Sequence, residues 1–223
     1  MKTAFPMTTQ PILQLDPEDE TTGRYARHPH GWSRNIEMLH DVTDYMTPEI
    51  LDASPLYLEI GCGHGEFIER LAKADPAGHY IGVENVPYFA VSAAKRVLNA
   101  GLDNVLILNQ NANALLSQVF PNQSLDKMYI LYPDPWPKRR HRKRRLIREE
   151  TYQRFQEVLT SGGEIEIWTD TEEWVELSAP FLRRLPGTLQ EEEITDRLHT
   201  PRTLFERKAK SKQHPIFHLL YQK

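Results

Sequence analysis

The sequence predicts an α/β fold in which seven strands form a mostly parallel sheet, with helices on both faces and an antiparallel C-terminal strand. Three observations support this prediction. Short apolar runs alternate with helical stretches through most of the chain, a glycine-rich turn joins the first apolar run to the first helix, and two adjacent extended runs close the sequence. Such alternation is typical of strand–helix–strand units, whose strands run parallel.

The elements follow from the spacing of apolar residues and from the residues that break it. Gly101 is expected to end the second helix, and the pair Gly162-Gly163 the fourth. Asn85 is a candidate N-cap, and a polar turn is expected over 186–202. The predicted strands are 56–60, 79–84, 104–108, 125–132, 164–168, 203–208 and 215–221. The predicted helices are 66–73, 87–100, 115–120 and 148–159, and a fifth helix follows a cap at 169–171 and ends near 184.

We expect residues 1–54 to form a partly mobile N-terminal arm and residues 55–223 to form one domain. Within the arm, Ile36, Leu39 and Val42 have helical spacing, so a helix is expected over 35–45. The stretch 24–34 is rich in Arg and His and is either a solvated segment or an additional cationic contact for a nucleic acid.

Composition excludes several classes of protein. No apolar stretch approaches the length of a membrane span, and the first residues lack the apolar core of a secretory signal. Cys62 is the single cysteine, so neither an internal disulfide nor a cysteine-based zinc site is expected, and no His cluster has metal-ligand spacing. We therefore expect a cytoplasmic protein without a metal.

The net charge of -4 conceals an asymmetry. Residues 138–148 contain eight Lys or Arg and no acid, which leaves 19 Lys and Arg against 31 Asp and Glu elsewhere. A basic island on an acidic body predicts a local site for a polyanion, whose binding should depend on salt.

Two acids flank the glycine-rich turn. The turn Gly61-Cys62-Gly63-His64-Gly65 follows a strand that contains Glu59, and the next strand ends in Glu84, 23 residues after Gly61. Glycine permits tight turning and close approach by a ligand, and an acid at the second strand end can accept hydrogen bonds from ribose hydroxyls. Glu66 replaces the last glycine of a dinucleotide fingerprint, so the pattern favours a cofactor with positive charge and free hydroxyls. The alternative is that both acids are ordinary strand-end residues.

A proline-rich stretch, Pro133-Asp134-Pro135-Trp136-Pro137, separates the fourth strand from the basic run. Because proline fixes its own φ and restricts the preceding residue, this loop should be stiff and should present Asp134 and Trp136 in set directions. The carboxyl ends of parallel strands are where ligands bind in such sheets. The alternative is a simple turn before a solvated charged helix.

Together, LEIGCGHGEF and IGVE resemble the class I S-adenosylmethionine-dependent methyltransferases, which have a Rossmann-like fold. PDPWPKRRHRKRR, GGEIEIWTD and TLFE are similar to motifs of the bacterial tRNA (guanine-N7)-methyltransferase family, and the resemblance covers about residues 56–221. It implies an enzyme that methylates N7 of the guanine at position 46 in the tRNA variable loop.

The resemblance also implies site residues. Asp134 is the catalytic position, beside both cofactor and target base, and Asn111 stands where the family usually has an aspartate beside the adenine. The cofactor-binding set is Glu59, Gly61, Gly63, Gly65, Glu84, Asn111 and Asp134; the substrate-binding set is Lys138, Asp170, Thr203 and Glu206; and the residues expected to hold the RNA backbone are Arg139, Arg140, Arg142, Lys143, Arg144 and Arg145.

Two other functions fit the same motifs. One is a class I methyltransferase that acts on a small molecule or a protein, which leaves the basic run unexplained. The other is a non-catalytic RNA-binding homologue, which Asn111 favours slightly because it removes a charge beside the cofactor. In each case a monomer or a homodimer is compatible with the sequence.

Overall fold

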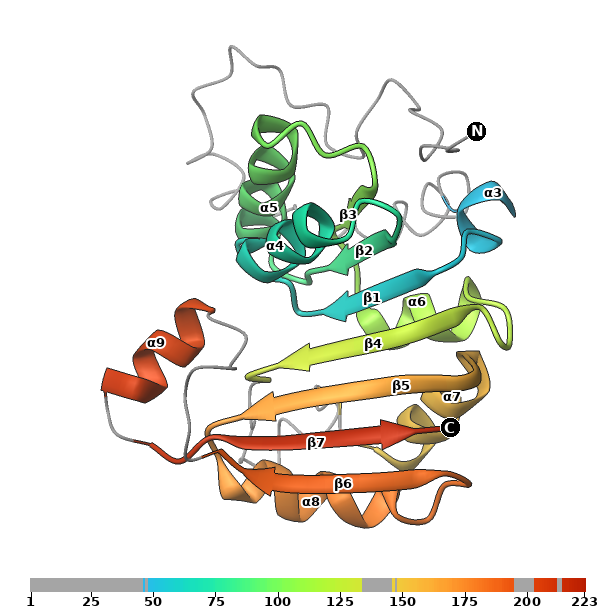
Figure 1. Ribbon diagram of the computed structural model, residues 1–223, viewed down its shortest axis with the longest axis vertical. Coiled ribbons are helices and arrows are strands. Elements are labelled where there is room, and N and C mark those ends of the chain that lie inside the picture. The colour runs from blue at the N-terminus through green and yellow to red at the C-terminus, as the bar shows by residue number, and fades with distance from the viewer. Residues whose placement is uncertain (1–45, 47, 134–145, 147, 195–202, 212–213) are drawn as a thin grey trace, which may run out of the picture. The chain divides into compact units, whose positions relative to one another are not determined.

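The computed structural model describes residues 46, 48–133, 146, 148–194, 203–211 and 214–223. Its seven strands form one sheet of order β3-β2-β1-β4-β5-β7-β6 (Figure 1). All described pairings are parallel except those of β7, which is antiparallel to both of its neighbours. The predicted mostly parallel sheet with an antiparallel C-terminal strand is confirmed. The chain divides after Val119 into two compact units.

The first unit contains three parallel strands with short helices between them. Buried aliphatic side chains of the strands, such as Leu58, Ile81 and Leu108, form its core. Helices α4 and α5 lie side by side against β2 and β3 (Figure 1). The elements are α3 (Pro48–Leu51), β1 (Leu56–Ile60), α4 (Glu66–Ala74), β2 (His79–Val83), α5 (Pro87–Asn99), β3 (Val105–Leu108) and α6 (Ala112–Gln118).

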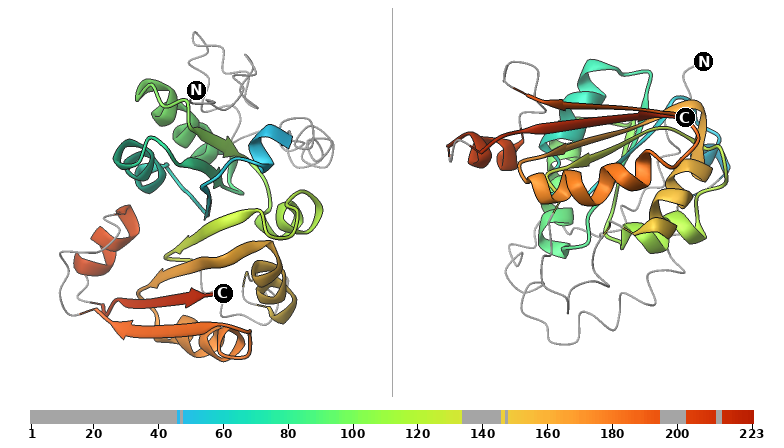
Figure 2. Two further views of the ribbon diagram at one scale, coloured as in Figure 1. Left: turned by 45° about the vertical axis from the view of Figure 1, so that its right-hand side comes forward. Right: turned by 90° about the horizontal axis from the view of Figure 1, so that it is seen from below.

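The second unit contains the antiparallel end of the sheet. Helices α7 and α8 pack on the same face of its strands (Figure 2), with the buried rings of Tyr152, Phe155 and Trp174 among them. The elements are β4 (Leu125–Leu131), α7 (Glu149–Val158), β5 (Leu159–Thr169), α8 (Glu172–Leu182), β6 (Thr188–Glu193), α9 (Leu204–Ser211) and β7 (Phe217–Gln222).

Three sequence-based expectations in the second unit were wrong. Gly162-Gly163 lies inside β5, which starts at Leu159, and Gly162 has a φ of 79°. The supposed polar turn over 186–202 contains β6, an exposed strand whose run of charge is typical of a sheet edge. Residues 203–208 form the start of helix α9, not a strand.

The start of α9 has a physical explanation. The Thr203 hydroxyl accepts a hydrogen bond from the Glu206 backbone N–H at 3.1 Å. This is half of a capping box, whose signature is Thr followed three residues later by Glu. The sequence therefore contained the signal for a helix, which the apolar residues between Thr203 and Glu206 concealed.

We expect Thr203→Ala to lower the free energy of unfolding by about 1 kcal/mol, because the substitution removes an N-cap acceptor. Thr203→Ser keeps the hydroxyl and serves as the control. Urea unfolding followed by circular dichroism measures both variants. Equal unfolding midpoints for Thr203→Ala and the wild type would show that the cap does not stabilise the fold.

Smaller shifts occur at helix starts in the first unit. The N-cap of α5 is Val86, not Asn85, and α6 begins at Ala112, three residues earlier than expected. The helix predicted over 35–45 lies outside the described residues. Met46 and Ile50, both within the predicted arm, are buried, while the domain boundary after residue 54 stays a prediction.

Candidate functional site

The glycine-rich turn joins β1 to α4 as predicted. Gly61, Gly63 and Gly65 have φ values of 77°, 54° and 75°, a region that side chains disfavour. The backbone N–H groups of Gly61 and Cys62 both donate to the Val83 carbonyl, at 2.7 and 3.1 Å, which fixes the turn against the end of β2. A Cβ on Gly65 would lie 3.0 Å from the Ala93 Cβ, so a side chain there would push α5 away.

Glu84 links the turn to the start of α5. Its side chain is buried, and its two carboxylate oxygens accept hydrogen bonds from the backbone N–H groups of Gly63 (3.0 Å) and Val86 (2.7 Å). A carboxylate oxygen has two lone pairs, so each oxygen retains an acceptor site beyond these bonds. Glu84 therefore orders the turn and keeps the capacity to accept hydroxyl hydrogens.

Glu59 lies in β1 beneath the start of α4, and it is buried. Burial raises its pKa to about 8, although a hydrogen bond from the Ile68 backbone N–H and the charge of Arg70 act in the opposite direction. Because the N-cap residue of α4, Gly65, has no side chain, the Glu59 carboxyl in the preceding strand β1 accepts the hydrogen bond of a helix-start N–H, that of Ile68. Its Oε2 atom is buried without a hydrogen-bond partner in the described part of the chain.

The loop after β3 approaches Glu84 through its backbone. The Asn109 side-chain amide donates to the Glu84 carbonyl at 2.7 Å. Asn111 is exposed, and its side-chain oxygen accepts hydrogen bonds from the backbone N–H groups of Asn113 (3.0 Å) and Ala114 (3.2 Å). The Asn111 oxygen is thus the N-cap acceptor of α6, a role for which Asn and Asp are equally suited.

In the second unit, Asp170 follows the carboxyl end of β5, and its Oδ2 atom lies 3.3 Å from the His214 Nδ1 atom. Thr203 and Glu206 are buried together at the start of α9. The structure therefore brings Thr203 and Glu206 together. The remaining predicted residues lie outside the described residues: Asp134, Lys138, Arg139, Arg140, Arg142, Lys143, Arg144 and Arg145.

Tyr132 is a feature that sequence reasoning missed. It has a φ of 49° and directly precedes the proline-rich stretch. A positive φ is a genuine outlier for a bulky residue, and such strain clusters at functional sites. The Tyr132 N–H donates to the Trp168 carbonyl at 2.7 Å, which holds the chain in this conformation as it leaves β4. No sequence signal marks a tyrosine for positive φ.

No group of three or more His, Cys, Asp or Glu side chains among the described residues is placed to hold a metal ion. None of the helices within the described ranges has both the length and the apolar character needed to cross a membrane.

Curated relatives resemble part of the chain. A tRNA (guanine-N(7)-)-methyltransferase of Geobacillus sp. (strain WCH70) is 40% identical over 124 residues, which are 56% of this chain and 56% of that protein. The enzyme of the same name from Geobacillus kaustophilus (strain HTA426) is 39% identical over 124 residues, 56% of this chain and 57% of the relative. The chain thus spans just over half the length of these relatives.

Solved structures share the fold. A precorrin-6y C5,15-methyltransferase from Geobacter metallireducens GS-15 has a TM-score of 0.58 at 13% identity, over 81% of this chain and 88% of its own. The [4+2]-cyclase SpnF has a TM-score of 0.56 at 16% identity, over 86% and 82%. Because a cyclase shares it, the fold alone does not determine the reaction.

A family model matches most of the chain. The model described as "Putative methyltransferase" covers residues 53–219, which include the glycine-rich turn, both flanking acids and α9. Because this match covers well over half of the chain, the chain belongs to this methyltransferase family.

Proposed function

We propose that the protein transfers a methyl group from S-adenosylmethionine to N7 of a guanine in tRNA, at position 46 of the variable loop. The observation that carries the proposal is the identity of about 40% to relatives named tRNA (guanine-N(7)-)-methyltransferase. The basic run 138–148 supports a polyanionic substrate, which a methyltransferase for small molecules does not need.

The described residues fit S-adenosylmethionine. Cβ atoms on Gly61 and Gly63 would meet no described atom within 4 Å, so the backbone of the turn is open to a ligand. Glu84 retains acceptor sites for ribose hydroxyls, and the buried Glu59 Oε2 atom suits a ligand of positive charge. Asn111 is proposed beside the adenine. When bound, this cofactor supplies an activated methyl group on a sulfonium.

The reaction requires little acid–base chemistry from the protein. Guanine N7 has an in-plane lone pair and no proton at neutral pH, so no general base has to activate it. We assign to Asp134 the acceptance of hydrogen bonds from the Watson–Crick edge of the guanine, with its negative charge favouring the positive charge that develops on the base. Catalysis then rests on positioning and electrostatics.

The nucleotide contacts are assigned from the family resemblance, and the backbone contacts from the positive charge of the basic run. Lys138, Asp170, Thr203 and Glu206 would contact the nucleotide, and Trp136 would either stack on a base or anchor its loop. The basic residues Arg139, Arg140, Arg142, Lys143, Arg144 and Arg145 would bind backbone phosphates, which makes tRNA affinity decrease as salt increases.

The test is incubation of the full chain with methyl-labelled S-adenosylmethionine and unmodified tRNA, followed by nucleoside analysis. We expect labelled 7-methylguanosine, and we expect its loss when the tRNA has adenosine in place of guanosine at position 46. Label in protein or metabolites would contradict the RNA substrate, and tRNA binding without label transfer would identify a non-catalytic homologue.

Asp134→Asn tests the assignment of the catalytic position in the same assay. We expect this variant to form much less 7-methylguanosine than the wild type while it binds S-adenosylhomocysteine with similar affinity, because the proposed role of the carboxylate concerns the base. Calorimetry measures that affinity. Equal losses of turnover and cofactor affinity would contradict the role.

A further inference from the structure

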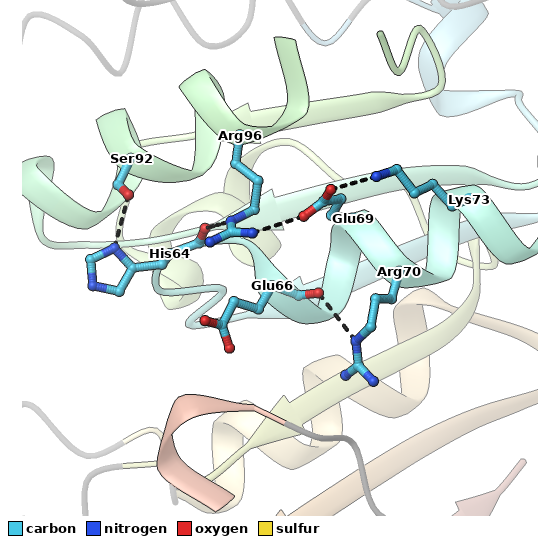
Figure 3. A network of polar contacts seen from close by, with 7 residues as sticks. All are labelled: His64, Glu66, Glu69, Arg70, Lys73, Ser92 and Arg96. Carbon is cyan, nitrogen blue, oxygen red and sulfur yellow. Dashed lines mark hydrogen bonds and ion pairs between the residues drawn. The ribbon is translucent and has the colours of Figure 1, made fainter. Parts of the chain in front are cut away.

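Helix α5 reaches back to the glycine-rich turn through one arginine. The Arg96 Nε atom donates to the His64 backbone carbonyl at 2.9 Å, and the Arg96 Nη1 atom donates to Glu69 Oε2 at 3.0 Å (Figure 3). His64 is the residue between Gly63 and Gly65, so the contact falls within the turn itself. Its backbone carbonyl has a charged partner outside the turn, and such bonds are stronger than bonds between neutral groups.

The His64 side chain is held from the same helix. Its Nδ1 atom lies 2.8 Å from the Ser92 hydroxyl oxygen, and its ring meets that of Phe89 edge-on at 4.8 Å between centroids (Figure 3 shows the Ser92 contact). Ser92 and Arg96 are four residues apart and therefore lie on one face of α5. Between them, Ala93 is in close contact with Gly65.

We propose that Arg96 and Ser92 are positioning residues that fix the glycine-rich turn in the conformation that binds the cofactor. This inference rests on the cofactor part of the proposed function. Three glycines give the free turn many alternative conformations, and ordering it during binding would cost affinity. Two contacts from α5 to His64 order the turn in advance, so their loss should reduce cofactor affinity.

Glu69 and Lys73 supply an internal control. Glu69 accepts hydrogen bonds from Lys73 and Arg96, which lower its pKa, and the Lys73–Glu69 distance of 2.6 Å marks an ion pair. Lys73 shares the acid with Arg96, but Lys73 donates its hydrogen bond to Glu69 and not to the turn (Figure 3). Replacing Lys73 therefore removes a similar charge and ion pair from the same site and leaves the bond to His64 intact.

The test is calorimetric titration of the full-length variants with S-adenosylhomocysteine. We expect Arg96→Met to bind about tenfold more weakly than the wild type and Ser92→Ala about threefold more weakly, while Lys73→Met stays within about twofold. Turnover at saturating cofactor and tRNA should change less than the Michaelis constant for S-adenosylmethionine. This pattern separates positioning of the turn from a direct role in the chemistry.

Three results would overturn the proposal: unchanged affinity in Arg96→Met, an equal loss in Lys73→Met, or a loss that appears in turnover alone. Thermal melting checks that each variant is folded, and Ser92→Ala tests the same turn if Arg96→Met fails to fold. The titration needs no tRNA, so its result stands whichever nucleoside the labelling assay finds. Failure of the proposed substrate and failure of this inference are thereby distinguished.

Discussion

Replacing Glu84 with Gln is expected to weaken binding of S-adenosylhomocysteine at least about a hundredfold, although the two side chains have the same shape. Both carboxylate oxygens accept hydrogen bonds from backbone N–H groups, those of Gly63 and Val86. Gln has one acceptor oxygen, and its amide group would face the second N–H donor to donor. A buried backbone donor would lose its partner, and two proposed ribose hydroxyls would lose a charged acceptor.

Calorimetry on Glu84→Gln, Glu84→Ala and the wild type measures this effect. Glu84→Ala leaves both backbone donors without the carboxylate and is expected to bind at least as weakly as Glu84→Gln. Glu173→Gln removes one exposed acid from α8 and controls for the change in net charge. If Glu84→Gln binds the ligand with the affinity of the wild type, the carboxylate orders the backbone without holding the cofactor.

The first unit shows what local sequence can predict. The run 56–66 combines a strand, positive-φ glycines and a helix start within eleven residues, and each depends on its near neighbours. The acid that follows β2, Glu84, was equally recognisable from the sequence. The Gly63 partner of Glu84 was not, because a hydrogen bond across 21 residues depends on how the strands are placed beside one another.

Other features depend on tertiary structure, which the spacing of residues along the sequence does not encode. The strand β6, with the sequence TLQEEE, lacks an apolar face because it is an exposed edge, so the usual strand pattern is missing. The placement of Asn111 beside the adenine stays a proposal, and the structure adds that its oxygen caps α6, a role that the spacing did not reveal. Arg96 lies in an ordinary helical pattern, and only its reach to His64 distinguishes it.

The protonation state of Glu59 is expected to control the stability of the free protein and its affinity for the cofactor. Burial raises its pKa to about 8, from the value of 4.5 that is usual for a solvated Glu carboxyl. Between these two values the folded protein binds a proton that the unfolded chain does not, so this group makes the free protein less stable as pH rises from 4.5 to 8. A cation beside the carboxyl favours its ionised form. Binding of the sulfonium should therefore release this proton.

We accordingly expect the affinity for S-adenosylmethionine to increase with pH, by up to about 50-fold between pH 6 and pH 8. Binding must remove the proton from Glu59, and this removal costs less free energy as pH rises towards the pKa of about 8. Glu59→Gln should abolish the part of this increase that belongs to Glu59. Gln can still accept the Ile68 N–H bond, so the variant imitates the protonated carboxyl and keeps the cap of α4. Calorimetric titrations at several pH values measure the affinity. Repeating them in buffers of different ionisation enthalpy gives the number of protons released.

The variant also separates Glu59 from the ionisation of the ligand itself, because the same ligand is titrated into both proteins. Because the bound wild type has lost this proton, its affinity should exceed that of Glu59→Gln, and the ratio of the two affinities should grow as pH rises from 6 to 8. Parallel pH profiles would instead mean that Glu59 stays in one protonation state throughout binding. In that case its buried carboxyl would serve only to cap α4, since the Ile68 bond needs no charge.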